Sequence, residues 1–137
     1  MQRAAADELL AGGGFEEGTA AWTVSRGQLD AVAAPVHSGA QAARLSGDSL
    51  QVHEVYQWLD LAPGQTYSFS GWVLLNDPNV QRVNLRVLWF DQTGSSVGEV
   101  ISPWLTIGQP AYQSLSTGVE PAPAQARSAR VGAVVVP

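Results

Sequence analysis

The residues that could act as acids, bases or nucleophiles are few and widely spaced in this sequence. Glu54 and Asp60 fall on the same face of one expected strand, but six residues at about 3.3 Å each would separate them by about 20 Å. Hydrolysis of a glycosidic bond requires two carboxyl groups that face one cleft. His37 and His53 lack the flanking motifs of a metalloprotease or of a hydrolase with a serine nucleophile. We therefore expect no enzyme activity.

The ionisable residues exclude several further kinds of chemistry. All seven basic side chains are arginines, which excludes a Schiff-base lysine and a phosphate-loop lysine. The absence of cysteine excludes disulfides and thiolate zinc sites. A net charge of −5 has the wrong sign for a surface that neutralises nucleic acid phosphates or anionic lipids. We expect no nucleic acid partner and no insertion into a membrane, since no run of about 18 apolar residues is present.

The aromatic residues, in contrast, suit ligand binding. Sugar rings have apolar faces that stack on flat side chains, and their hydroxyls need polar partners. Trp72 follows Ser70 by two residues, and Arg86 follows Asn84 by two, so each pair falls on one face of a strand. Together they would offer one flat ring with three polar neighbours. The alternative is that Trp72 packs under a loop, with Arg86 stacked on it as a cation–π pair.

The elements that must position these residues are short strands. Fourteen glycines and eight prolines interrupt the chain at intervals that leave room for strands but rarely for helices. A length of 137 residues with 45% hydrophobic and 14% charged side chains suits one folded domain. We expect an all-β fold, a sandwich of two antiparallel sheets. The expected strands are 52–61, 66–75, 83–91, 97–101, 112–117 and 129–136, with shorter ones at 9–10, 23–24, 29–32 and 42–45.

The order of the strands decides whether the polar residues meet Trp72. Alternation puts large apolar side chains on one face of each strand and Ser70, Trp72, Asn84 and Arg86 on the other. If the loop 76–82 joins its two flanking strands as antiparallel neighbours, the register that stacks their apolar faces brings Trp72 beside Arg86 and Asn84. We expect this arrangement.

Four other aromatic residues are expected at the surface. Trp58 points outward with Tyr56, but we expect the segment 62–65 to carry the chain from one sheet to the other. Trp58 would then lie on the sheet opposite Trp72. Trp104 and Tyr112 either line the edge of a groove or cover the rim of the sandwich.

Four stretches of the sequence, taken in order, carry a resemblance to a known family. The stretches are Leu9-Leu10-Ala11-Gly12-Gly13-Gly14-Phe15-Glu16 with Trp22, the segment 36–45, the segment 57–73, and Pro121-Ala122-Pro123-Ala124 before 129–136. They are similar to the galactose-binding-like jelly-roll modules, the carbohydrate-binding modules found beside catalytic domains in secreted xylanases and glucanases. The similarity spans about residues 9 to 136, which leaves 1–8 as an N-terminal extension to a single domain, 9–137.

The resemblance implies a jelly roll that holds a polysaccharide or oligosaccharide on a concave sheet face without catalysis. It also implies an extracellular or cell-surface protein in which the module is tethered to a catalytic domain. The alternative is a structural or protein-interaction sandwich in which the aromatic residues only pack. On the first interpretation the ligand-binding residues are Trp72, Arg86, Asn84, Ser70, Trp58 and Tyr112.

The resemblance further implies a structural calcium ion. Glu16 matches the carboxylate ligand of that site, and backbone carbonyls near 37–39 would supply further oxygens. Modules of this kind usually finish with another strand whose aspartate completes the shell of about six to eight oxygens, and this sequence ends at Pro137 without it. The alternative is that Glu16 is a simple turn residue. A missing last strand would leave an exposed edge or be replaced by a strand from another copy, which would make an oligomer.

Overall fold

A computed structural model describes residues 9–62 and 64–137, and within them every regular element is a strand. The expected all-β fold is therefore confirmed, and the expected N-terminal extension 1–8 lies outside the described residues. The expected strand at 9–10 is wrong, because these residues lead into a turn at 11–14. The strands are β1 (Thr23–Val24), β2 (Gln28–Val32), β3 (Ala42–Ser46), β4 (His53–Asp60), β5 (Thr66–Val73), β6 (Arg82–Phe90), β7 (Ser96–Ile101), β8 (Gln113–Pro121) and β9 (Ser128–Val136).

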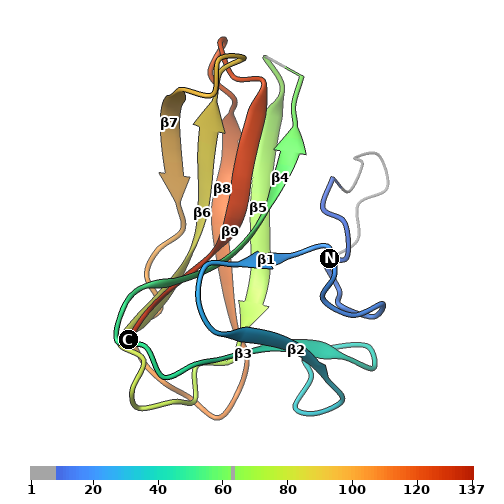
Figure 1. Ribbon diagram of the computed structural model, residues 1–137, viewed down its shortest axis with the longest axis vertical. Helices are drawn as coiled ribbons and strands as arrows, with labels where there is room; N and C mark the ends of the chain where they lie inside the picture. The colour runs from blue at the N-terminus through green and yellow to red at the C-terminus, as the bar shows by residue number, and fades with distance from the viewer. Residues whose placement is uncertain (1–8, 63) are drawn as a thin grey trace.

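The strands form two packed layers and a hairpin. Five of them make an antiparallel sheet in the order β1-β4-β9-β6-β7, which we call the large sheet. A second antiparallel pair, β5 with β8, makes the small sheet. In Figure 1 the strands β4 to β9 run roughly upright, the short β1 runs crosswise, and the β2–β3 hairpin lies across the lower end of the sandwich. This is the expected antiparallel sandwich.

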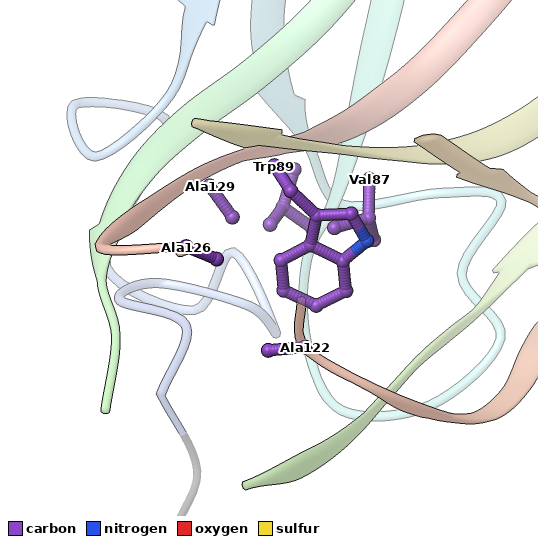
Figure 2. Close-up of a cluster of buried hydrophobic side chains, with 6 residues drawn as sticks. Val87, Trp89, Ala122, Ala126 and Ala129 are labelled. Carbon is purple, nitrogen blue, oxygen red and sulfur yellow. The ribbon is translucent and has the colours of Figure 1, made fainter. Parts of the chain in front are cut away.

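The core lies between the large and small sheets. Val87 and Trp89 of β6 pack with Val131 of β9, and Tyr67 and Phe69 of β5 cover them from the other layer. Figure 2 shows the Trp89 indole surrounded by small side chains, among them three alanines from the segment that ends in β9. A second buried cluster continues the core toward the lower end, and it contains Leu75, Val83, Leu85, Leu105 and Leu115. The alternation predicted for β5 and β6 is confirmed.

The pairing predicted for β5 and β6 is wrong. The chain between them crosses from the small sheet to the large one, so β5 pairs with β8 while β6 pairs with β9 and β7. The apolar faces of β5 and β6 therefore meet across the core instead of side by side. Alternation fixes which face of a strand is buried, but both arrangements bury the same face. The crossing expected between β4 and β5 is confirmed, since these strands belong to different sheets.

Candidate functional site

The solvent side of the large sheet carries an unusual concentration of charged and aromatic side chains. The register places Tyr56 of β4, Gly132 of β9 and Arg86 of β6 in one row across the sheet. Trp58 and Arg130 share the next row. We call this surface the large-sheet face and define it by Glu54, Tyr56, Trp58, Arg82, Asn84, Arg86, Phe90, Glu99, Ile101, Arg130 and Val134, with Trp104 at its border.

An ion cluster occupies the middle of the large-sheet face. The Glu54 carboxylate accepts a hydrogen bond from Arg86, and its other oxygen contacts an Arg130 nitrogen at 2.5 Å without hydrogen-bond geometry. Glu54 is only 8% exposed, whereas Arg86 and Arg130 are 26% and 30% exposed. Burial, and then the charge of Arg130, lower the pKa of Arg86, and Glu99 opposes this shift. A guanidinium stays protonated in proteins, so the cluster presents two fixed cations around one buried anion.

Gly132, beside this cluster, lets β9 and β4 approach each other closely. A side chain at Gly132 would overlap the Val55 carbonyl oxygen and would come within 2.8 Å of the Tyr56 Cβ. The Arg130 guanidinium lies 4.7 Å from the centre of the Tyr56 ring, in cation–π contact. Tyr56 is partly buried and is thereby linked to the ion cluster.

Aromatic side chains flank the ion cluster on one side. Trp58 of β4 reaches over β9 toward Phe90 of β6, with ring centres 5.0 Å apart and planes tilted by 54°. Trp58 remains 54% exposed. A half-exposed indole supported by a second ring is suited to stacking on a flat ligand.

A small depression lies on the other side of the cluster, with Asn84 in its lining. Its volume is about 140 Å³, and Arg86, Ile101 and Trp104 also line it. Beyond β7 the chain stays bonded to β6 through Ser102 and Leu105, and Trp104 lies between them, 4.1 Å from the Arg82 guanidinium. Asn84 is 1% exposed, and its Oδ1 has no hydrogen-bond partner. A buried amide with an unused acceptor is costly, and a ligand hydroxyl could complete it.

The predicted group around Trp72 is not formed. Trp72 and Ser70 lie on β5 in the small sheet, whereas Asn84 and Arg86 lie on β6 in the large sheet. The reason is the wrong strand pairing described above. Trp58 does lie on the sheet opposite Trp72, as expected, and this places Trp58 on the same face as Arg86 and Asn84.

Trp72 belongs instead to a separate aromatic cluster. His37 stacks on Trp72 with ring centres 4.0 Å apart and planes at 15°, and Tyr112 meets His37 edge-on at 5.7 Å. The Tyr112 hydroxyl donates to the Pro35 carbonyl at 2.8 Å. Burial raises the pKa of Tyr112, so the phenol is a neutral donor near pH 7. Tyr112 therefore lies beside Trp72, away from Arg86 and Asn84.

Three participants in the large-sheet face were not expected from the sequence. The sequence suggests only a catalytic role for Glu54, which the distance to Asp60 excludes, and it gives Arg130 and Phe90 no role in a site. Alternation already put Phe90 on the side of Asn84 and Arg86, and the same count along 129–136 puts Arg130 outward. The sequence pattern does not reveal that β9 lies between β4 and β6, and this position is what brings these residues together.

Glu16 lies where a carboxylate ligand for calcium was expected. Its Oε1 accepts the Ala40 amide proton at 2.9 Å, and a Cβ at Gly39 would overlap the same oxygen. The turn at Gly39, with φ of +69°, is therefore shaped around the carboxylate. Among the described residues no three His, Cys, Asp or Glu side chains form a group that could hold a metal ion.

No helix in the part of the chain that the structure describes is long and apolar enough to cross a membrane.

Comparisons with known proteins are consistent with these features. The sequence pattern of a family described as carbohydrate binding domain matches residues 7–101. No curated protein matches the sequence. Solved structures with the same fold, a jelly-roll sandwich, are similar over most of the chain.

One of these structures is the enzymatically active domain of tailspike protein 4 from bacteriophage CBA120, with 16% identity and a TM-score of 0.72. The match covers 93% of this chain but only 19% of the tailspike chain. Another is the C-terminal family 22 carbohydrate binding module of Clostridium thermocellum Xyn10B, with 17% identity, coverage of 90% and 81%, and a TM-score of 0.68. A third, TmCBM61 in complex with β-1,4-galactotriose, has 19% identity, coverage of 95% and 88%, and a TM-score of 0.63.

Proposed function

The chain belongs to the carbohydrate-binding domain family, and from that premise we propose that its large-sheet face binds a single polysaccharide or oligosaccharide chain. The observation that carries this proposal is Asn84, a buried amide whose acceptor oxygen is unused beside a depression that opens to solvent. The sheet supplies the length for several sugar rings, since β6 extends about 26 Å from Arg82 to Phe90.

Each part of the large-sheet face has a distinct role in this proposal. Trp58, backed by Phe90, stacks on the apolar face of one ring. Arg86 and Arg130 donate hydrogen bonds to hydroxyl and ring oxygens, and Glu54 holds both guanidinium groups in place. Asn84 bonds a hydroxyl in the depression. A hydroxyl both donates and accepts, so it serves the amide in either orientation.

We propose further that the domain breaks no bond. Glu54 is committed to two arginines and cannot readily act as a proton donor. Asp60, on the same strand, is six residues further along, which is about 20 Å. This separation is far beyond the about 5–10 Å between the carboxyl groups of glycoside hydrolases.

A binding domain of this kind helps a tethered enzyme by raising the local concentration of its substrate. We propose that it belongs to an extracellular protein and that a catalytic domain is tethered to it. Attachment to a polymer would then raise the local concentration of substrate near that catalytic domain without any new contact.

We also propose that Glu16 holds a structural calcium ion together with backbone carbonyls of 37–39. The support is the turn at Gly39, whose missing side chain leaves space that the carboxylate fills. Bound calcium would stabilise the turn that carries His37. Thermal unfolding in millimolar calcium and in chelator tests this: an ion present at about 100 times its Kd adds about 2.7 kcal/mol. An equal Tm in both buffers, or a Glu16→Gln variant that keeps the full calcium effect, would contradict it.

Affinity electrophoresis in gels that contain xylan, β-glucan, mannan or soluble cellulose derivatives tests the large-sheet face. The wild type should be retarded by at least one polymer, and Trp58→Ala and Asn84→Ala should bind it about tenfold more weakly, which is about 1.4 kcal/mol. Leu50→Ala is the matched control, because Leu50 is a 90% exposed apolar residue outside this face. Retardation that is the same in Trp58→Ala and Leu50→Ala would contradict the proposed site.

A further inference from the structure

The solvent side of the small sheet is chemically unlike the large-sheet face. The register of β5 with β8 gives four outward pairs, and we call this surface the small-sheet face. Its eight side chains are all exposed, and none is charged. By contrast, three of the seven arginines of the chain lie on the large-sheet face. The pairs are Trp72 with Ser114, Ser70 with Ser116, Ser68 with Val119, and Thr66 with Pro121.

Hydroxyl groups dominate the small-sheet face. Five of its eight residues are serine or threonine, and they extend from Thr66 to Trp72 over about 20 Å. A surface strip of this size without any charge is unusual, because exposed strands of soluble proteins normally carry charges that prevent edge-to-edge association. The strip is therefore polar and neutral along its whole length.

Trp72 closes one end of this strip, and it is held in a fixed position. Its side chain is 51% exposed although His37 stacks on the indole at 4.0 Å. Tyr112 supports His37 from the side and binds the Pro35 carbonyl, which ties the loop 33–41 to the start of β8. The indole is therefore ordered before any ligand arrives, which lowers the entropy that binding must overcome.

We propose that the small-sheet face is a second carbohydrate-contact surface, for an uncharged polysaccharide, with Trp72 as its stacking residue. Trp72 would stack on one ring, and the hydroxyls of Ser70, Ser114 and Ser116 would exchange hydrogen bonds with sugar hydroxyls. The absence of cations on the strip and the net charge of −5 disfavour an acidic polymer. The strip has only two large apolar side chains, Trp72 and Val119, fewer than the apolar centre of a protein interface would need.

This surface is additional to the site of the proposed function. The two faces lie on opposite sides of the sandwich, with the core between them. One extended sugar chain cannot lie along both, so a domain with two faces holds two chains, or two parts of one polymer network. Binding to a polymer would then gain from avidity, whereas binding to a short oligosaccharide would not.

The test uses the same neutral polymers with variants of each face. Trp72→Ala and Ser70→Glu change the small-sheet face, Trp58→Ala changes the large-sheet face, and Leu50→Ala is the control. Ser70→Glu adds a charge at an exposed position and removes no packing, so it keeps the test valid if Trp72→Ala unfolds. We expect each small-sheet variant to bind polymer about tenfold more weakly. The double variant Trp58→Ala with Ser70→Glu should lose retardation altogether.

The outcomes separate the two faces. If Trp58→Ala alone abolishes retardation and both small-sheet variants bind as the wild type does, the second surface is refuted while the proposed function stands. If the small-sheet variants lose affinity and Trp58→Ala does not, the second surface stands and the large-sheet site is refuted.

Scattering of light by mixtures of the protein with soluble polymer gives an independent check. The wild type should cross-link the polymer and scatter more light than any of the three single variants, Trp72→Ala, Ser70→Glu and Trp58→Ala, and equal scattering by all four proteins would refute the presence of two binding faces.

Discussion

Replacement of Glu54 by glutamine should weaken both the fold and the binding face. Glu54→Gln keeps the shape of the side chain but removes the one anion between Arg86 and Arg130. The two guanidinium groups then repel each other across a partly buried surface. Their positions, and with them the hydrogen-bond donors offered to a ligand, should no longer be fixed.

The size of the effect follows from burial. Removal of one partner of a fully buried ion pair costs about 3–5 kcal/mol. Here Glu54 is 8% exposed but the arginines are 26% and 30% exposed, so water recovers part of that loss. We expect a loss of about 2 kcal/mol. For a chain of this length that corresponds to a Tm lower by about 7 °C.

Thermal unfolding by circular dichroism measures this change, and a double-mutant cycle isolates its cause. Arg130→Gln is the second variant of the cycle. If the ion pair is responsible, the double variant should be more stable than the sum of the two single losses predicts, by about 0.5–3 kcal/mol. A Tm for Glu54→Gln within 1 °C of wild type, measured at about 0.1 M salt, or strictly additive losses, would refute the reasoning.

Three further predictions concern the fold. Trp89→Ala removes the largest ring of the buried core and should lower the free energy of unfolding by about 3–5 kcal/mol in denaturant titration; a loss below about 1 kcal/mol would contradict the packing described. Gly132→Ala forces a Cβ onto the Val55 carbonyl, so it should lower the Tm, whereas Gly14→Ala is the control, because its Cβ would have no neighbour closer than 3.9 Å; an equal Tm for the two variants would contradict this. The pKa of Asp91 is lowered, first by the Thr93 hydroxyl and then by the Ser95 amide. The folded state thus binds fewer protons than the unfolded state near pH 4, and stability falls as the pH drops through that range. Tm measured from pH 6 to pH 3 should fall more steeply in wild type than in Asp91→Asn, and parallel curves would contradict this.

Most of the fold can be predicted from periodicity and turn residues. The strands β4, β5, β6 and β9 begin and end within two residues of the expected positions, and their buried faces are as alternation predicts. The short hydrophobic pair Leu9-Leu10 misleads, because Leu10 joins the core from a loop. Side-chain burial is a local property of a strand, which is why a sequence pattern reports it well.

The site could be predicted only in part, because it depends on which strands are neighbours. Asn84 and Arg86 are correctly identified as outward residues, and Trp58 as an outward aromatic residue, but their grouping needed the position of β9. That strand carries Gly132 and Arg130 between them. Pairing between residues some 45 positions apart in the sequence leaves no periodic signal, since every register that buries the same face looks alike.

The most direct test of the large-sheet face is a map of the residues that contact a sugar. Amide chemical shifts of the labelled domain, followed by NMR during titration with the neutral oligosaccharide of the best-binding polymer, give that map residue by residue. We predict the largest changes on β4, β9 and β6 around Tyr56, Arg130 and Arg86, together with the side-chain amide of Asn84. Saturable changes that leave all of these signals in place and cluster only elsewhere would contradict the account.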